Sequence, residues 1–145
     1  MGPRRGHLGV TGGLHHVELW VPSLARAEES WGWLLGELGW ARHQNWAAGR
    51  SWILNTTYLV MEESPALTSD SHERLRPGLN HLAFQAGTPA EVDRLVEAAP
   101  SRGWSLLFAD RHPHAGGPDT YAAYLEDRDG YEAELVAGSP HSTSY

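Results

Sequence analysis

The chain has 145 residues, a formal net charge of −7 and no cysteine. That length suits one compact domain with a real core. The lack of cysteine excludes thiol nucleophiles, thiolate metal ligands and disulfides. All eleven basic residues are arginine, which also excludes Schiff-base chemistry by lysine. The acidic charge, without a basic cluster, argues against nucleic-acid binding. No apolar run is long enough to span a membrane and no signal peptide is recognisable, so we expect a cytoplasmic protein.

A repeat organises the chain. The segment Gly-Leu-His-His-Val-Glu-Leu at 13–19 returns as Gly-Leu-Asn-His-Leu-Ala-Phe at 78–84. Each copy is followed by a helical stretch and then by a Gly-Trp pair, at 39–40 and at 103–104. The two halves therefore look like copies of one unit with a histidine at the same place. Equivalent histidines of this kind can converge on one point, which is one way to build a metal site.

The first half begins with a strand at 13–21. Ser23 is a suitable N-cap for a helix with a regular apolar face, which Gly36 interrupts near its end and Gly39 stops. Short strands follow. Their expected ranges are 40–46, 50–55 and 57–63. Residues 64–77, rich in Ser, Pro, Asp and Arg, form a linker.

The second half begins with a strand at 79–86. Thr88, Pro89 and Glu91 together signal the start of a helix that ends near Gly103. Strands are expected at 104–109, 120–126 and 131–137, with a turn at 127–130. We therefore predict an α+β fold: a single domain, 1–145, of two tandem βαβββ modules, about 13–63 and about 78–137.

Side-chain alternation along a strand decides which residues share a face. His16, Glu18 and Trp20 lie on one side of the first strand, opposite an apolar row that suits packing under a helix. His81 has the same relation to its own strand. In the last strand an apolar row at 131, 133 and 135 places Glu132 and Glu134 on the histidine side. Two histidines and at least one glutamate are thus expected on the same side of a sheet, and that face is the candidate site.

The set of motifs resembles the vicinal oxygen chelate superfamily, which includes glyoxalases, bleomycin-resistance proteins, fosfomycin-resistance thiol transferases and extradiol dioxygenases. The resemblance covers about residues 13–137. It rests on the duplication, the two histidine-bearing strand openings, Trp-Leu-Leu-Gly at 33–36 and Asp-Arg-Asp-Gly-Tyr-Glu-Ala-Glu-Leu at 127–135. It implies two modules whose curved mixed sheet surrounds a cup that holds a divalent metal.

Carried over by position, the resemblance makes His16, His81 and Glu134 the metal ligands. Such a set suits Fe2+, Mn2+, Zn2+ or Ni2+ and leaves positions for two adjacent substrate oxygens. Glyoxalases add a fourth protein ligand on the fourth strand. Residues 58–61 of this chain are apolar at the matching positions, and only Glu62, one or two residues later, could take that role. This departure counts against lactoylglutathione lyase activity. Tyr124 occupies the place of a tyrosine that approaches the substrate in the thiol-transferase branch, although this chain lacks that branch's basic C-terminal extension.

Other polar residues have two readings. Glu132 is either a base close to the metal or a charge at the rim of the cup, and we favour the rim. His15 is expected on the helix side as a packed or solvated residue. His112 and His114 lie in a loop with prolines and glycines, where we expect them to be solvated. If that loop is a lid, either histidine is a candidate acid or base.

Three of the seven tryptophans, Trp20, Trp46 and Trp52, belong to strands of the cup wall and are candidates for stacking on an aromatic substrate. We therefore expect a small-molecule metalloenzyme with catalytic Tyr124 and Glu132. Dioxygenase chemistry ranks first, followed by thiol transfer or isomerisation. The alternative is a metal-free drug- or metabolite-binding protein of the bleomycin-resistance type. The resemblance also implies a homodimer, with the ligands either in one chain or shared between two.

Overall fold

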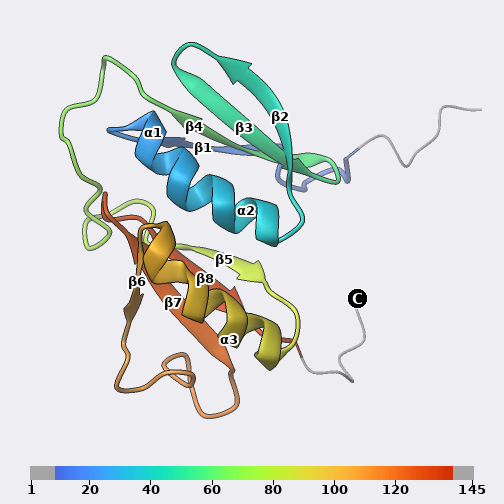
Figure 1. Ribbon diagram of the computed structural model, residues 1–145. Coiled ribbons are helices and arrows are strands. Elements are labelled where there is room, and N and C mark those ends of the chain that lie inside the picture. Colours follow the sequence, from blue (N-terminus) through green and yellow to red (C-terminus); the bar gives the residue numbers. More distant parts are fainter. Residues whose placement is uncertain (1–8, 139–145) are drawn as a thin grey trace, which may run out of the picture. The chain divides into compact units, whose positions relative to one another are not determined.

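The computed structural model describes residues 9–138, and the chain divides between Asp70 and Ser71 into two compact units. The division falls inside the segment 64–77 that the sequence marks as a linker. The N-terminal residues, on which the expectation about a signal peptide rests, and the C-terminal tail both lie outside the described part. No helix within 9–138 is long and apolar enough to cross a membrane. Figure 1 shows the elements of each unit, which are described separately below.

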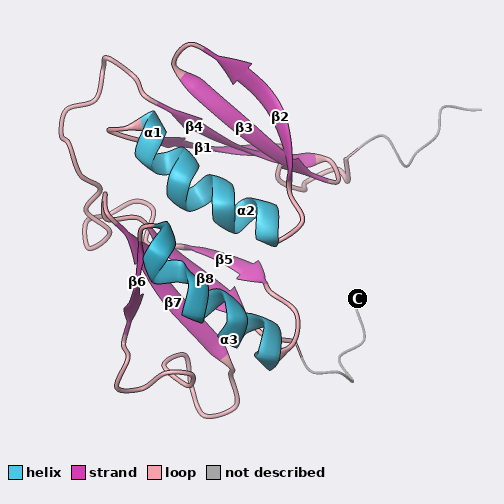
Figure 2. Ribbon diagram, in the orientation of Figure 1, coloured by secondary structure: helices cyan, strands magenta, loops and turns pink. Residues whose placement is uncertain are grey.

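Unit 1 is a four-stranded mixed sheet with one broken helix on it (Figures 1 and 2). The strand order is β1-β4-β3-β2, with β1 parallel to β4 and the other pairs antiparallel. The strands are β1 (His16–Trp20), β2 (Ala41–Trp46), β3 (Gly49–Leu54) and β4 (Thr57–Glu62). These match the four expected strands within a few residues, which is the usual uncertainty of strand ends.

The helix of unit 1 starts where the sequence predicts. The Ser23 hydroxyl accepts a hydrogen bond of 3.2 Å from the backbone N–H of Arg26. The helix consists of α1 (Leu24–Ala27), a π-helical turn (Glu28–Gly32) and α2 (Trp33–Glu37). The irregularity is therefore the π turn in the middle and not Gly36. Gly39, with a φ of 91°, ends the helix as expected, because a left-handed residue stops helical continuation.

Unit 2 repeats this plan with the order β5-β8-β7-β6, and β5 is parallel to β8. Its strands are β5 (Leu82–Gln85), β6 (Trp104–Leu107), β7 (Ala122–Asp127) and β8 (Glu132–Val136). The helix α3 (Pro89–Ala98) begins at Thr88, whose hydroxyl accepts from the backbone N–H of Glu91 at 3.2 Å. A 3-10 turn, Ala99–Arg102, then leads to β6. The predicted α+β class and the two βαβββ modules are confirmed.

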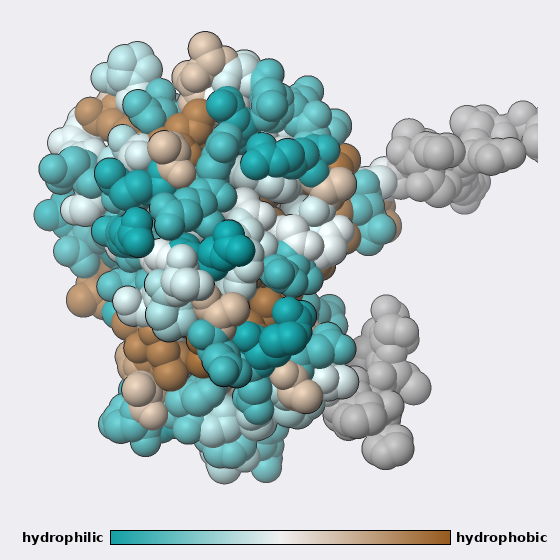
Figure 3. All heavy atoms as spheres, viewed as in Figure 1, coloured by the Kyte–Doolittle hydropathy of each residue, from teal (hydrophilic) through white to brown (hydrophobic). Residues whose placement is uncertain are grey.

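Each unit buries one face of its sheet under its helix. In unit 1 the helix buries Trp31, Leu34 and Leu35 completely, and the strands supply Leu59 and Met61 to the same core. In unit 2, α3 buries Val92 and Leu95, and the strands supply Leu125, Ala133 and Leu135. Polar residues dominate the surface seen in Figure 3, where apolar residues form only small patches. The second face of each sheet, which the unit's own helix does not cover, is called its open face below.

Candidate functional site

The open face of the unit 2 sheet gathers the predicted residues by register. Ala83 of β5 pairs with Glu134 of β8, and His81, two residues before Ala83, lies on the same face. Tyr124 of β7 pairs with Glu134 from the other side, and Glu126 pairs with Glu132. The expectation that His81 shares a face with both glutamates of β8 is met, and Tyr124 joins them.

His81 is held by oxygen atoms at both ring nitrogens. Its Nε2 lies 3.0 Å from Glu134 Oε1. Its Nδ1 lies 2.7 Å from Asn80 Oδ1 and 3.3 Å from Glu132 Oε2. A neutral imidazole carries one N–H, so one of its two sides then presents a lone pair to an oxygen acceptor. The lone pair and that oxygen repel each other, and a cation bound at the nitrogen would remove the repulsion.

Glu132 is buried, and our preference for a rim position was wrong. Its side chain is 3% exposed, with Oε1 3.3 Å from Arg74 Nη1. Burial raises the pKa of the Glu132 carboxyl, while the positive charges of Arg74 and His81 lower it. Glu126 and Glu134 raise this pKa further through their negative charges. A buried carboxylate needs cationic partners of this kind, because its desolvation is costly.

Tyr124 presents a phenol to the same group. Its ring lies edge-on to His81 with a centroid distance of 6.0 Å and edge-on to Phe108 at 5.5 Å. Burial raises the pKa of the Tyr124 hydroxyl, and the charge of Glu134 and a hydrogen bond to it act in the same direction. A phenol with a raised pKa stays protonated at neutral pH and acts as a hydrogen-bond donor.

Unit 1 carries His16 on the open face of its own sheet. The His16 ring stacks on Tyr58 with a centroid distance of 4.9 Å and an interplanar angle of 6°. His16 Nδ1 lies 2.9 Å from Nδ1 of His15. His15 is exposed, as expected of a solvated residue, but its ring lies against His16 and Tyr58 and not against the helix.

Two of the three candidate tryptophans lie on the open face of the unit 1 sheet, and the third does not. Trp20 donates to Glu18 at 2.7 Å, and Trp46 donates to Glu62 at 3.2 Å. Trp52 pairs with Leu59, on the helix face of the sheet, and is only 2% exposed. A Cβ at Gly32 of the helix would lie 3.4 Å from its indole. The expectation that Trp52 stacks on a substrate is therefore corrected: it is a core residue.

Register also explains the missing fourth ligand. In unit 2, Ala83 is two residues after His81 and pairs with Glu134. In unit 1, Glu18 is two residues after His16 and pairs with Val60. Val60 therefore occupies in unit 1 the place that Glu134 has in unit 2. A buried valine cannot ligate a metal, as the apolar fourth strand indicated. Glu62 lies on the same face but accepts the Trp46 hydrogen bond.

His81 and Glu134 suit adjacent positions on one divalent ion. Two donor atoms bound at about 2.1 Å and at right angles lie about 3 Å apart, which is the spacing of this pair. Within residues 9–138, no group of three or more acidic or histidine side chains is close enough to hold a metal. Unit 2 by itself therefore offers two of the three ligands that the resemblance implies.

The long loop before β7 lies beside Tyr124. A Cβ at Gly116 would lie 2.8 Å from the Tyr124 hydroxyl. His114 is exposed, with Nδ1 2.8 Å from the carbonyl oxygen of Thr120, and His112 is partly buried. The expected solvation of His114 agrees with this placement.

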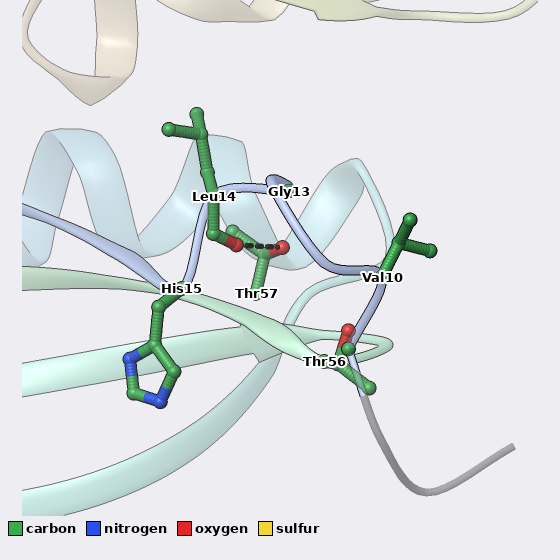
Figure 4. Close-up of a pocket in the computed structure, with 7 residues that line it drawn as sticks. Val10, Gly13, Leu14, His15, Thr56 and Thr57 are labelled. Carbon is green, nitrogen blue, oxygen red and sulfur yellow. Dashed lines mark hydrogen bonds between the residues drawn. The ribbon is translucent and has the colours of Figure 1, made fainter. Parts of the chain in front are cut away.

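A pocket of about 520 Å³ lies elsewhere, at the start of β1. Figure 4 shows its walls, with the Thr57 hydroxyl donating to the carbonyl of Leu14 at 2.8 Å. Apolar Val10 and Leu14 line it together with Thr56 and His15. None of the eight predicted site residues lines this pocket, so we do not assign the chemistry to it.

The sequence reasoning missed Arg74. This residue lies in the segment taken as a linker, yet its guanidinium contacts Glu126 and Glu132 at 3.1 and 3.3 Å. Local composition gave no signal for this role, because an arginine among serines and prolines is typical of a solvated loop. The pairing of Tyr58 with His16 could have been inferred from the alignment of β1 with β4 if the ends of both strands had been known.

Two tandem βαβββ modules, each with chemistry-bearing side chains on the open sheet face, define a glyoxalase-like class of fold. The model of the Glyoxalase/Bleomycin resistance protein/Dioxygenase superfamily matches residues 15–124, and the chain belongs to that superfamily. The uncharacterized protein YqjT of Bacillus subtilis is 44% identical over 128 residues, which cover 87% of this chain and 99% of YqjT.

Solved structures agree with this assignment. A candidate glyoxalase from Bacillus halodurans superposes with a TM-score of 0.83 at 43% identity, covering 88% of this chain and 96% of that one. A glyoxalase/bleomycin resistance protein from Albidiferax ferrireducens gives a TM-score of 0.69 at 21% identity, covering 87% and 98%. The second likeness supports the fold alone. The predicted superfamily is thus confirmed.

Proposed function

We propose that this protein is a metal-dependent enzyme acting on a small molecule with two adjacent oxygen atoms. The observation that carries the proposal is the group formed by His81, Glu134, Glu132 and Tyr124 on the open face of unit 2. Its donor set, an imidazole and a carboxylate 3.0 Å apart, suits Fe2+, Mn2+, Zn2+ or Ni2+. When bound, such an ion polarises substrate oxygens and stabilises negative charge that develops on them.

The residues of unit 2 then have distinct roles. His81 and Glu134 hold the ion, and Glu132 fixes the ring of His81 through Nδ1. The Tyr124 hydroxyl, protonated at neutral pH, hydrogen-bonds to Glu134 in this structure. Turned toward a substrate oxygen instead, it would donate its one proton there, and it is the candidate general acid. Glu132 contacts His81 and Arg74, so its proposed part in catalysis is to support the imidazole.

His16 is the proposed third ligand. This part of the proposal rests on the repeat in the sequence, where His16 and His81 hold equivalent places. Two histidines and one carboxylate form the set that non-haem Fe(II) enzymes use with dioxygen. We therefore rank dioxygenase chemistry first, and thiol transfer or isomerisation next. We also propose a homodimer, which light scattering tests directly.

An aromatic substrate is favoured by the open face of unit 1. Trp20 is 40% exposed there, and the indole of Trp46 lies on Gly49, where an added Cβ would approach it closely. Large flat side chains on an open face suit stacking on a planar ligand. Trp52 has no part in this proposal because it is buried.

A metal-free binding protein is the second candidate. One observation favours it: no single unit of the described chain supplies three ligands. In that function the same faces hold a ligand by stacking and hydrogen bonds, without a reaction.

Metal analysis separates the two candidates. Purified protein is stripped with a chelator and titrated with Fe2+, Mn2+, Zn2+ and Ni2+ by calorimetry. The enzyme proposal predicts stoichiometric binding of at least one ion, lost in His81→Ala and Glu134→Gln. His114→Ala, a histidine of the same unit outside the group, is the matched control and retains binding. Wild-type protein that binds none of the four ions would remove the metalloenzyme proposal and leave the binding protein.

A further inference from the structure

The segment before His81 is fixed on the turn between β7 and β8. The backbone N–H of His72 donates to the carbonyl of Asp129 at 2.7 Å, and the His72 ring stacks on Tyr131 at 4.4 Å. His72 Nε2 lies 2.9 Å from the carbonyl oxygen of Leu79. A segment with loop-like composition therefore has a defined position beside the open face of unit 2.

Arg74, two residues after His72, reaches His81 by two routes. Its guanidinium contacts Glu132 Oε1 at 3.3 Å, and Glu132 Oε2 lies 3.3 Å from His81 Nδ1. Its backbone carbonyl accepts from Asn80 Nδ2 at 3.1 Å, and Asn80 Oδ1 lies 2.7 Å from the same His81 nitrogen. Both acceptors that face Nδ1 are thus tied to Arg74.

Arg74 brings positive charge to a face that carries three carboxylates. Glu126, Glu132 and Glu134 lie on it together, and Arg74 forms ion pairs with the first two. Glu132 is 3% exposed, so without a cationic partner its carboxyl must turn toward solvent or find another partner. Either movement takes the charged acceptor away from His81 Nδ1.

We propose that Arg74 is a positioning residue that selects the tautomer of His81. With Arg74 in place, Glu132 and Asn80 accept the proton of Nδ1, and Nε2 presents its lone pair toward Glu134. Carboxylates that orient a metal-binding histidine from its far nitrogen act in this way and raise metal affinity. The effect on metal binding rests on the proposed function, because Nε2 of His81, which this tautomer leaves without a proton, is the atom proposed to bind the ion.

The test reads the His81 tautomer in metal-free protein. Ring 15N shifts are recorded at alkaline pH, where imidazole is neutral, for wild type, Arg74→Gln and Arg74→Lys. We expect the proton on Nδ1 in wild type, a shift toward Nε2 in Arg74→Gln and partial recovery in Arg74→Lys. Arg76→Gln, an exposed arginine of the same segment, is the control and should match wild type. If the wild type binds a metal, its affinity in Arg74→Gln should fall by about 10- to 100-fold.

A purely structural role predicts other results. If Arg74→Gln is folded and its His81 proton remains on Nδ1 as in wild type, the proposal is wrong. If Arg74→Gln does not fold, Arg74→Met/Glu132→Met replaces the buried pair by apolar side chains, an exchange that proteins often tolerate. Retention of the Nδ1 proton there would show that Asn80 suffices and would also overturn the proposal. The tautomer is read without metal, so a protein that binds none would remove the proposed function and still test Arg74.

Discussion

Gly130 tests whether the turn between β7 and β8 holds the His72 segment. Gly130 and Gly39 share a φ of 91°, a left-handed conformation that non-glycine residues adopt at a cost of about 1–2 kcal/mol. At Gly39 an added Cβ meets nothing within 4 Å. At Gly130 it would lie 2.2 Å from the carbonyl oxygen of His72, which is backbone and cannot swing away.

The two alanine variants therefore separate strain from the clash. Gly39→Ala should lose about 1–2 kcal/mol of unfolding free energy from φ alone. Gly130→Ala should lose the same amount plus about 1–3 kcal/mol for the forced shift of His72, in the range for overpacking. Guanidinium unfolding followed by circular dichroism gives the totals. Hydrogen exchange in β7 and β8 locates the loss in unit 2.

A functional consequence follows, because His72 leads into the segment that carries Arg74. In Gly130→Ala the His81 15N shifts should move in the direction expected for Arg74→Gln, whereas Gly39→Ala should leave them unchanged. Equal loss of stability in the two variants would refute the inference that the turn seats His72. Unchanged His81 15N shifts in a destabilised Gly130→Ala would refute the inference that the position of His72 affects His81.

Three further predictions concern single side chains. Quenching of tryptophan fluorescence by catechol should weaken in Trp46→Phe and persist in Trp52→Phe; loss of the quench in Trp52→Phe alone would contradict the face assignment. Burial, with the charges of Asp127 and Asp129, raises the pKa of Tyr131 from 10.0 to about 12. The folded state thus holds this proton more tightly than the unfolded state, so stability should fall as pH rises from about 10 to about 12. Urea unfolding over that range should show a smaller fall in Tyr131→Phe, and an equal fall would exclude Tyr131 as the cause. Gly116→Ala should displace the Tyr124 hydroxyl and shift its labelled ring resonance, whereas Gly36→Ala, with open space around its Cβ position, should not; an unmoved resonance in Gly116→Ala would count against the loop's contact with Tyr124.

Much of the candidate site follows from rules that act within one strand. Alternation places Glu132 and Glu134 on one face, and the repeat gives His16 and His81 equivalent places. The same rule anticipates the apolar residue at Val60, where a fourth ligand would stand. These inferences succeed because a strand has a period of two residues whatever surrounds it.

Other positions depend on pairing between strands. Trp52 belongs to a strand that the sequence locates well, but its face follows from its register with Leu59. A slip of one residue exchanges the two faces, so strand ends known only within a few residues leave the face open. The burial of Glu132 has a similar origin, since an alternating pattern gives the face and not the depth of a side chain.

The sequence by itself determined the duplication, the α+β class, the superfamily and the face shared by His81 and Glu134. Only the tertiary structure decided that Arg74 returns to that face, that Glu132 is buried beside it and that Trp52 belongs to the core. Periodicity is a property of neighbouring residues and is legible along the chain. The path of an irregular segment depends on contacts such as that of His72 with Asp129 and Gly130, which join residues distant in sequence.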